Sequence, residues 1–165
     1  MRRLIALSIT LLATAAASAE PWTVGQTLGD IGMSDQHGDP RVIGAPVRAV
    51  LFSRDMEGGK ILREAVGEGD PGRLLLERAG AVYVADVSRM PGVIRSLFAM
   101  PSLRRRGYPI LIDADGSRTA DFPSAEKRGT LVGLADRRVT SIEHFASAEE
   151  LRAALEALIP AAQAD

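Results

Sequence analysis

The chain has 165 residues, of which 46% are hydrophobic and 25% charged, so it has about the length of one globular domain and is too apolar to be intrinsically disordered. It contains no cysteine, which excludes disulfides, thiolate nucleophiles, thiol redox chemistry and cysteine-bound metal centres in these residues. The formal net charge of −1 shows no basic excess, so no nucleic-acid partner is expected.

Residues 1–19 have the pattern of a secretory signal peptide: the positive pair Arg2 and Arg3, an apolar stretch, and a small-residue Ala-Ser-Ala cleavage site. The apolar stretch is short and rich in alanine, serine and threonine, which disfavours a membrane span; an uncleaved anchor is the alternative. We therefore expect export to a bacterial periplasm and no stable membrane insertion after cleavage. Residues 20–165 are then expected to form a single domain with a formal charge of −3.

Strand and helix patterns alternate after this leader. Turn residues at 36–40, between short apolar stretches, predict a small N-terminal hairpin. Residues 47–53 have a strand pattern whose continuous apolar run, 49–52, is typical of a buried strand, and Asp55 can cap the helix that follows. Asp70, followed by proline, favours the start of a second helix, and residues 81–87 form another strand pattern.

The second half of the chain continues this alternation. A helix is expected after Pro91, with a buried face made by the large apolar residues Val93, Ile94, Leu97 and Phe98. Three further strand patterns follow, at residues 108–113, 130–135 and 139–145. The turn between the last two is short enough to require a hairpin. Ser147 and Glu150 form a capping box at the start of a final helix.

This order of elements predicts the fold class. Strands that are separated by helices pair in parallel through right-handed crossovers, whereas the last two strands pair antiparallel. The predicted fold is therefore an α/β three-layer sandwich: a mixed five-stranded sheet with helices on both faces, preceded by the small N-terminal hairpin.

The same order and several local strings resemble thioredoxin-fold proteins of the peroxiredoxin and thiol-antioxidant branch. The strings that carry the resemblance are G-M-S-D-Q-H-G-D-P (32–40), V-L-F-S-R-D (50–55) and K-R-G-T-L-V (127–132). Within the superfamily, residues 90–116 and 134–155 look closest to the small periplasmic YtfJ-type proteins. The resemblance implies a thioredoxin-like domain over most of the chain after the leader.

The chain departs from this superfamily at the reactive position. Peroxiredoxins attack peroxide with a cysteine thiolate in the first turn of the helix that follows the first central strand. Here that turn begins Ser53-Arg54-Asp55-Met56-Glu57, without a thiol. A serine hydroxyl is not ionised at neutral pH and cannot pass through a sulfenic acid. Thiol peroxidase and disulfide oxidoreductase activities of this chain alone are therefore excluded, and no catalytic residue is predicted.

Two loops should meet at the carboxyl end of the sheet, where α/β proteins commonly bind ligands. They contribute six candidate binding residues: Arg54, Asp55, Glu57, Lys127, Arg128 and Thr130. One interpretation is that Arg128 forms an ion pair with Asp55 or Glu57 and closes the vacant site. The other is that Lys127, Arg128 and the helix N-terminus hold a small anion or a peptide carboxylate.

Signatures of other chemistries are missing from the sequence. His37 and His144 lack metal-ligand spacing, no G-x-S-x-G turn is present and no G-x-G-x-x-G opens a helix, so neither a metal nor a cofactor is predicted. The sequence favours an exported, non-catalytic module that binds a periplasmic protein or peptide, or serves as an accessory to a redox partner. The alternative is a non-thiol oxidoreductase or a protein that binds a cofactor such as a flavin.

Overall fold

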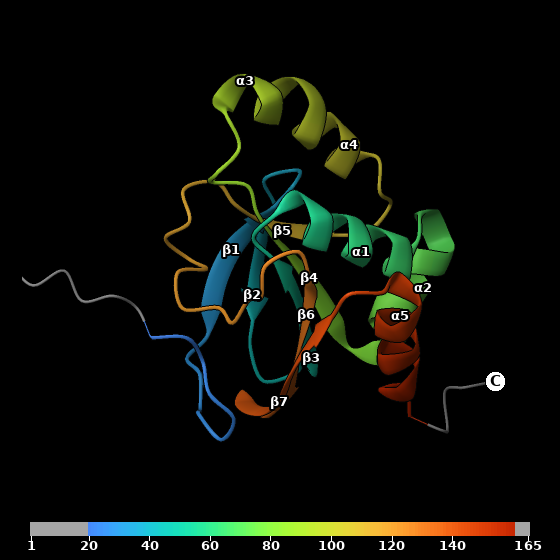
Figure 1. The fold of residues 1–165 in the computed structure, drawn as a ribbon. Coiled ribbons are helices and arrows are strands. Elements are labelled where there is room, and N and C mark those ends of the chain that lie inside the picture. The colour runs from blue at the N-terminus through green and yellow to red at the C-terminus, as the bar shows by residue number, and fades with distance from the viewer. Residues whose placement is uncertain (1–19, 161–165) are drawn as a thin grey trace, which may run out of the picture.

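The computed structural model describes residues 20–160, and the expected signal peptide lies outside these residues. Within them, seven strands form one sheet in the order β2-β1-β5-β4-β3-β6-β7 (Figure 1). The strands are β1 (Ile31–Asp35), β2 (Pro40–Ile43), β3 (Ala49–Ser53), β4 (Ala81–Asp86), β5 (Ile110–Asp113), β6 (Gly129–Ala135) and β7 (Arg138–Phe145).

The helices lie between and after these strands. They are α1 (Met56–Val66), α2 (Gly69–Ala79), α3 (Gly92–Ile94), the π-helical turn η1 (Arg95–Ala99), α4 (Met100–Arg104) and α5 (Ala148–Ala157). We call the consecutive segments α3, η1 and α4 (residues 92–104) the helical arm. None of the helices within residues 20–160 is long and apolar enough to cross a membrane.

The sheet is mixed, as predicted. β3, β4 and β5 pair in parallel, while β6 pairs antiparallel with both β3 and β7. It is larger than the five strands expected, because the N-terminal hairpin continues the sheet instead of preceding it. Ser34 and Asp35 of β1 lie opposite Ile112 and Leu111 of β5. The hairpin thereby supplies hydrogen-bond partners for backbone groups that would otherwise form an unpaired edge.

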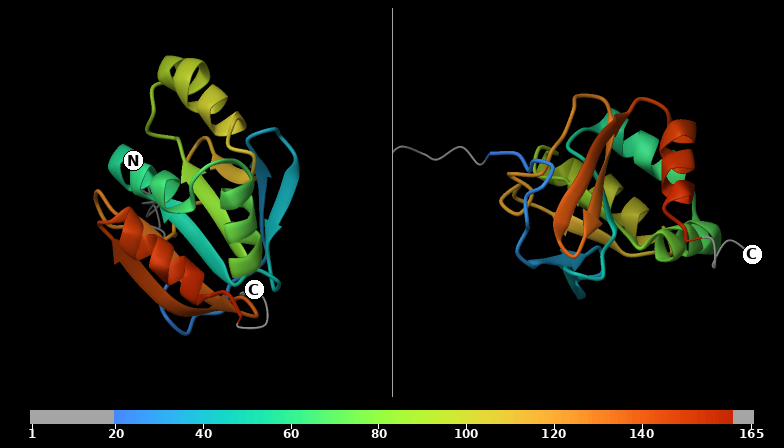
Figure 2. Two further views of the ribbon diagram at one scale, coloured as in Figure 1. Left: turned by 90° about the vertical axis from the view of Figure 1, so that its right-hand side faces the viewer. Right: turned by 90° about the horizontal axis from the view of Figure 1, so that it is seen from below.

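The two faces of the sheet are covered differently. Helices α1, α2 and α5 pack on one face, around Leu51, Tyr83 and Leu131 (Figure 2). The crossovers from β3 to β4 and from β4 to β5 run in the same direction, so right-handed connections place their helices on the same side. The N-terminal segment and the β5–β6 loop cover the second face, where helices were also expected, and the ring centroids of Trp22 and Phe122 lie 4.0 Å apart.

The helix starts follow local capping chemistry. Asp55 caps α1 and Ser147 caps α5, as the sequence predicts. The second helix begins earlier than expected: α2 has Glu68 at its N-cap. Asp70 lies instead in the first turn, where it accepts a hydrogen bond of 3.2 Å from Arg73.

The prediction that the helical arm has a buried apolar face is wrong. The four side chains that were expected to form it are exposed, at 66% for Val93, 46% for Ile94, 63% for Leu97 and 66% for Phe98. The arm stands at the top of the molecule in Figure 1, away from the packed face of the sheet. Its contact with the core is made instead by Met100 and Leu103, and Met90 just before the arm packs there too. Helical spacing places apolar residues on one face, but it does not say what that face meets.

Candidate binding cavity

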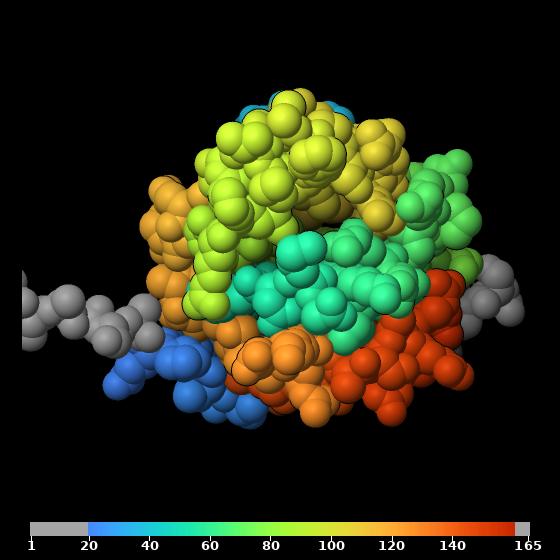
Figure 3. Space-filling model, turned by 45° about the horizontal axis from the view of Figure 1, so that its top comes forward, coloured from blue at the N-terminus to red at the C-terminus, as the bar shows by residue number. Residues whose placement is uncertain are grey.

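A cavity of about 520 Å³ opens at the carboxyl ends of β3 and β4, between α1 and the helical arm. In Figure 3 it appears as the hollow between the teal surface of α1 and the yellow-green surface of the arm. Ligands commonly bind at this end of an α/β sheet, where the loops after neighbouring strands meet. The cavity is therefore the candidate functional site.

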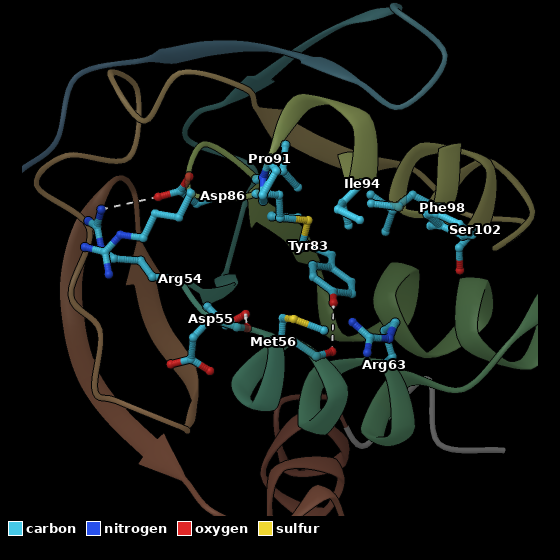
Figure 4. A pocket seen from close by; sticks show the side chains of 18 residues that line it. Arg54, Asp55, Met56, Arg63, Tyr83, Asp86, Pro91, Ile94, Phe98 and Ser102 are labelled. Carbon is cyan, nitrogen blue, oxygen red and sulfur yellow. Dashed lines mark hydrogen bonds and ion pairs between the residues drawn. The ribbon is translucent and has the colours of Figure 1, made fainter. Parts of the chain in front are cut away.

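Large apolar side chains form most of its lining. α1 contributes Met56, which is 72% exposed, and the helical arm contributes Ile94 and Phe98 from the opposite side (Figure 4). Further apolar contacts come from Met90, Pro91 and Leu103. Exposed apolar patches with a hollow shape are typical of surfaces that bury themselves against a ligand or partner.

Arg54 borders the cavity and holds the long loop between β5 and β6. Its Nη1 lies 3.4 Å from Oδ2 of Asp86, and the two side chains are only 18% and 1% exposed. Its Nη2 donates to three loop carbonyl groups, those of Thr119, Ala120 and Phe122. Figure 4 shows the guanidinium reaching toward Asp86, away from the helical arm. Arg54 is therefore engaged in contacts that fix the loop.

Two buried aspartates at the ends of β4 and β5 complete this anchoring. The Thr119 hydroxyl lies 2.9 Å from Oδ2 of Asp113 and 3.3 Å from Oδ2 of Asp86. Asp113 also accepts hydrogen bonds from the backbone N–H groups of Gly116, Arg118 and Thr119. Buried carboxylates need such partners to remain ionised at low cost. Their hydrogen bonds are thus made within the protein.

Asp55 joins α1 to the far end of the same loop. Its Oδ1 accepts from the Gly58 N–H at 2.7 Å, and its Oδ2 accepts from the Lys127 N–H at 2.8 Å. The N-terminus of α1 is the place where the sequence suggests that an anion is held. The carboxylate of Asp55 already takes that place, and a second anion there would meet a like charge.

The six residues predicted from the sequence do not converge on one site. Arg54 and Asp55 line the cavity. Glu57 and Lys127 line a separate hollow of about 510 Å³, formed by a different face of α1. The main-chain carbonyl of Arg128 packs against Gly58 so closely that any Cβ at residue 58 would overlap it.

Arg128 and Thr130 both interact with His144 of β7, which is not one of the six residues. Thr130 is fully buried, and its Oγ1 lies 3.0 Å from Nδ1 of His144. Partial loss of hydration, and then the positive charge of Arg128, lower the pKa of His144. The expected ion pair of Arg128 with Asp55 or Glu57 does not form in the part of the chain that the structure describes.

Two residues that the sequence did not single out define one end of the cavity. Tyr83 of β4 is 2% exposed, its hydroxyl donates to the carbonyl of Gly59 at 3.4 Å, and burial raises its pKa. Arg63 of α1 lines the cavity and faces this hydroxyl (Figure 4). In the sequence Arg63 sits among Lys60 and Glu64, which is the ordinary pattern of a solvated helix face. Only the fold brings it to the cavity.

The polar groups around the cavity do not form a catalytic arrangement. The Ser53 hydroxyl donates to the backbone carbonyl of Asp55 at 3.4 Å. A serine nucleophile needs a general base beside it, and His144 is hydrogen-bonded to Thr130 outside the cavity. Among residues 20–160, no group of three or more His, Asp or Glu side chains could hold a metal ion. The arrangement is suited to binding an apolar group.

The elements and their order define a thioredoxin-like α/β fold, which confirms the fold class expected from the sequence. No protein-family model matches the chain, and no curated protein matches its sequence. The likeness is therefore visible only among solved structures, and the closeness to YtfJ-type proteins stays a prediction.

Three solved structures illustrate this likeness. The peroxidoxin BcpB from Mycobacterium tuberculosis is 23% identical, with a TM-score of 0.53 over 82% of this chain and 95% of that one. A hypothetical protein from Sinorhizobium meliloti is 20% identical, with a TM-score of 0.54 over 85% and 86%. The exposed lipoprotein thioredoxin Etrx1 from Streptococcus pneumoniae is 10% identical, with a TM-score of 0.53 over 78% and 99%. At such identities the fold alone is shared, and function must be argued from this chain's own residues.

Proposed function

We propose that this chain is an exported, non-catalytic thioredoxin-fold module that binds a peptide or a segment of a periplasmic protein in the cavity beside α1. The observation that carries the proposal is the apolar cavity of about 520 Å³, at the carboxyl end of the sheet, in a chain without cysteine. Export is supported by the signal-peptide pattern of residues 1–19.

The size and chemistry of the cavity support this role. Its volume falls within the range of about 300–1,000 Å³ that is usual for ligand sites. Met56 and Phe98 line it from opposite sides and are 72% and 66% exposed, so an apolar side chain between them would bury surface on both. Burying one large apolar side chain contributes about 1.5–3 kcal/mol. Methionine side chains also adapt to ligands of different shape.

The charged groups nearest the cavity support binding over catalysis. Asp86 is paired with Arg54, and both carboxylate oxygens of Asp55 accept backbone N–H groups. A general base must be free to accept a proton from a substrate. These carboxylates hold the β5–β6 loop in place instead, which leaves the apolar walls as the part of the cavity that a ligand would contact.

Neighbouring residues of the helical arm supply a matched test. Phe98 lines the cavity and Leu97 does not, although they are 66% and 63% exposed. The probe is a fluorescein-labelled pool of hexapeptide amides whose last four positions are randomised among apolar residues, and binding is followed by fluorescence anisotropy. Phe98→Ser should weaken binding about tenfold or more, since it removes on the order of 1.4 kcal/mol of apolar contact. Leu97→Ser should leave it nearly unchanged.

Two outcomes would count against the proposal. Equal losses in both variants would show that the arm, but not the cavity, attracts apolar peptides. A wild-type protein that binds no member of the pool would remove the peptide-binding role altogether. A visible absorption band on protein purified from its native export pathway would favour the cofactor-binding alternative instead.

A further inference from the structure

We propose that the cavity receives the C-terminal end of its peptide, with the terminal carboxylate bound by Arg63 and the last apolar side chains packed between α1 and the helical arm. This inference rests on the proposed function and adds to it the direction of the ligand and the chemical group that is recognised. The carboxylate site is distinct from the one that the sequence suggests at Lys127 and Arg128: Lys127 lines the separate hollow, and Arg128 is not part of the described lining of this cavity.

Within the part of the chain that the structure describes, Arg63 is a cation without an anionic partner. Its guanidinium lies in the cavity wall, near the Tyr83 hydroxyl and at the same end as Ser102 (Figure 4). The acidic residues closest to it in sequence are already paired: Glu64 lies 4.0 Å from Lys60, and Glu68 lies 2.9 Å from Arg106. No carboxylate within residues 20–160 forms an ion pair with Arg63.

The charge balance of the lining favours an anionic ligand group at this end. Three arginines and two aspartates line the cavity, but Arg54 and Asp86 neutralise one another and Asp55 is occupied by backbone N–H groups. Arg63 and the exposed Arg89 are the cations that remain without an ion pair in the described lining. A guanidinium offers two parallel N–H groups, which match the two oxygens of a carboxylate.

The apolar contacts match a peptide better than a straight hydrocarbon chain. Ile94 and Phe98 are four residues apart on the arm, and both line the cavity. Four helical residues span about 6 Å, and side chains of alternate residues in an extended peptide are about 6.6 Å apart. An extended peptide can therefore place two successive side chains of one face against Ile94 and Phe98. Binding of this kind leaves its last residue free to reach Arg63.

Matched peptide pools test the inference. The randomised apolar hexapeptides are made once with a free C-terminal carboxylate and once as the C-terminal amide, and both are titrated by fluorescence anisotropy. We expect the wild-type protein to bind the acid pool about tenfold more tightly, a difference of about 1.4 kcal/mol for one charge-assisted contact. Arg63→Gln should reduce this preference to nearly none, and Arg63→Lys should keep part of it.

A control variant and a second ligand separate the outcomes. Lys127→Gln removes an exposed positive charge beside the other face of α1 and should leave the acid preference unchanged. Circular dichroism verifies that each variant is folded. Equal binding of acid and amide pools would overturn the inference and leave the proposed function standing, as would a preference lost in Lys127→Gln but kept in Arg63→Gln. Binding of neither pool would overturn both, and binding of dodecanoate alone would assign the cavity to a fatty acid.

Discussion

Two regions beside the cavity, the β5–β6 loop and the helical arm, are built by opposite means. The loop, which we call the loop wall, contributes no side chain to the described cavity lining; it is held to the lining residues Arg54 and Asp86, and to Asp113, by a network of buried polar contacts. Every described buried side-chain polar atom has a hydrogen-bond partner. The helical arm, in contrast, exposes four large apolar side chains and touches the body through few polar contacts, such as Arg95 to the Ala114 carbonyl at 2.8 Å.

This difference separates stability from binding. A wall whose polar groups are all satisfied keeps one geometry, because any shift would leave buried donors or acceptors without partners. A wall of exposed apolar side chains loses few contacts when it moves, and covering it with a ligand lowers the free energy. We therefore expect substitutions in the loop wall to change mainly the free energy of unfolding, and substitutions in the arm to change mainly binding.

The largest effect is expected at Arg54. Arg54→Met keeps the aliphatic volume but leaves the buried carboxylate of Asp86 without its cation and three loop carbonyl groups without a donor. Removing one partner of a buried ion pair costs about 3–5 kcal/mol. Urea unfolding followed by the fluorescence of Trp22, which packs against Phe122 of this loop, measures the loss.

Arg73→Met is the matched control, because it removes surface ion pairs with Asp70 and Glu77. Exposed pairs of this type contribute little to stability. The contrast between the walls would be lost if the two arginine variants unfolded at the same urea concentration.

The Arg54 network also shows how far a sequence can predict this molecule. The strands over β3, β4 and β6 are recognisable because each is a short apolar run, and Asp55 and Ser147 are recognisable as caps because capping is local. The partners of Arg54 lie 32 to 70 positions away in the chain, so no local pattern indicates them. The residue was predicted near the site, but its contacts with the loop were not.

The cavity itself could not be predicted for a related reason. Ile94 and Phe98 have the spacing of a buried helix face, and the sequence cannot show that this face meets a hollow instead of the core. Arg63 lies on an amphipathic helix whose charges look solvated in sequence. Among the described residues, Arg63 has no acidic partner because Glu64 and Glu68 are paired with Lys60 and Arg106, and those pairs depend on the positions of these side chains in space.

The same substitution, glycine to alanine, should lower stability where α1 meets the loop wall but not in the helical arm. At Gly58 the first turn of α1 touches the carbonyl of Arg128, and a Cβ would overlap it. Gly58→Ala should force α1 and the loop apart and lower the free energy of unfolding by about 1–3 kcal/mol, the usual range for overpacking. Gly92, at the start of the arm, has nothing within 4 Å of the position of a Cβ.

Gly92→Ala should therefore be neutral, or stabilising by up to about 1 kcal/mol through helix propensity. Thermal and urea unfolding of the two variants measure both effects. A destabilised Gly92→Ala variant would mean that the arm is packed as tightly as the loop wall.

The smallest effect is expected at the end of the loop wall, where Arg128 faces His144. Loss of hydration and the charge of Arg128 lower the pKa of His144 in the folded chain. The unfolded chain therefore takes up this proton first as the pH falls through the ordinary histidine range, near about 6.5. The contribution of neutral His144 to stability is present above that range and is lost as the pH falls through the lower pKa of the folded state.

Arg128→Gln should raise the pKa of His144 and reduce this loss of stability at mildly acidic pH. The imidazole signals of His144 in an NMR titration report the pKa directly, and Arg105→Gln, which removes a charge beyond the end of the helical arm, should leave it unchanged. If Arg128→Gln left the pKa of His144 unchanged, the Arg128 side chain would have to lie elsewhere. An ion pair of Arg128 with Asp55 or Glu57 would then be the better interpretation. A raised pKa would place its charge beside β7, outside the cavity that Arg63 lines.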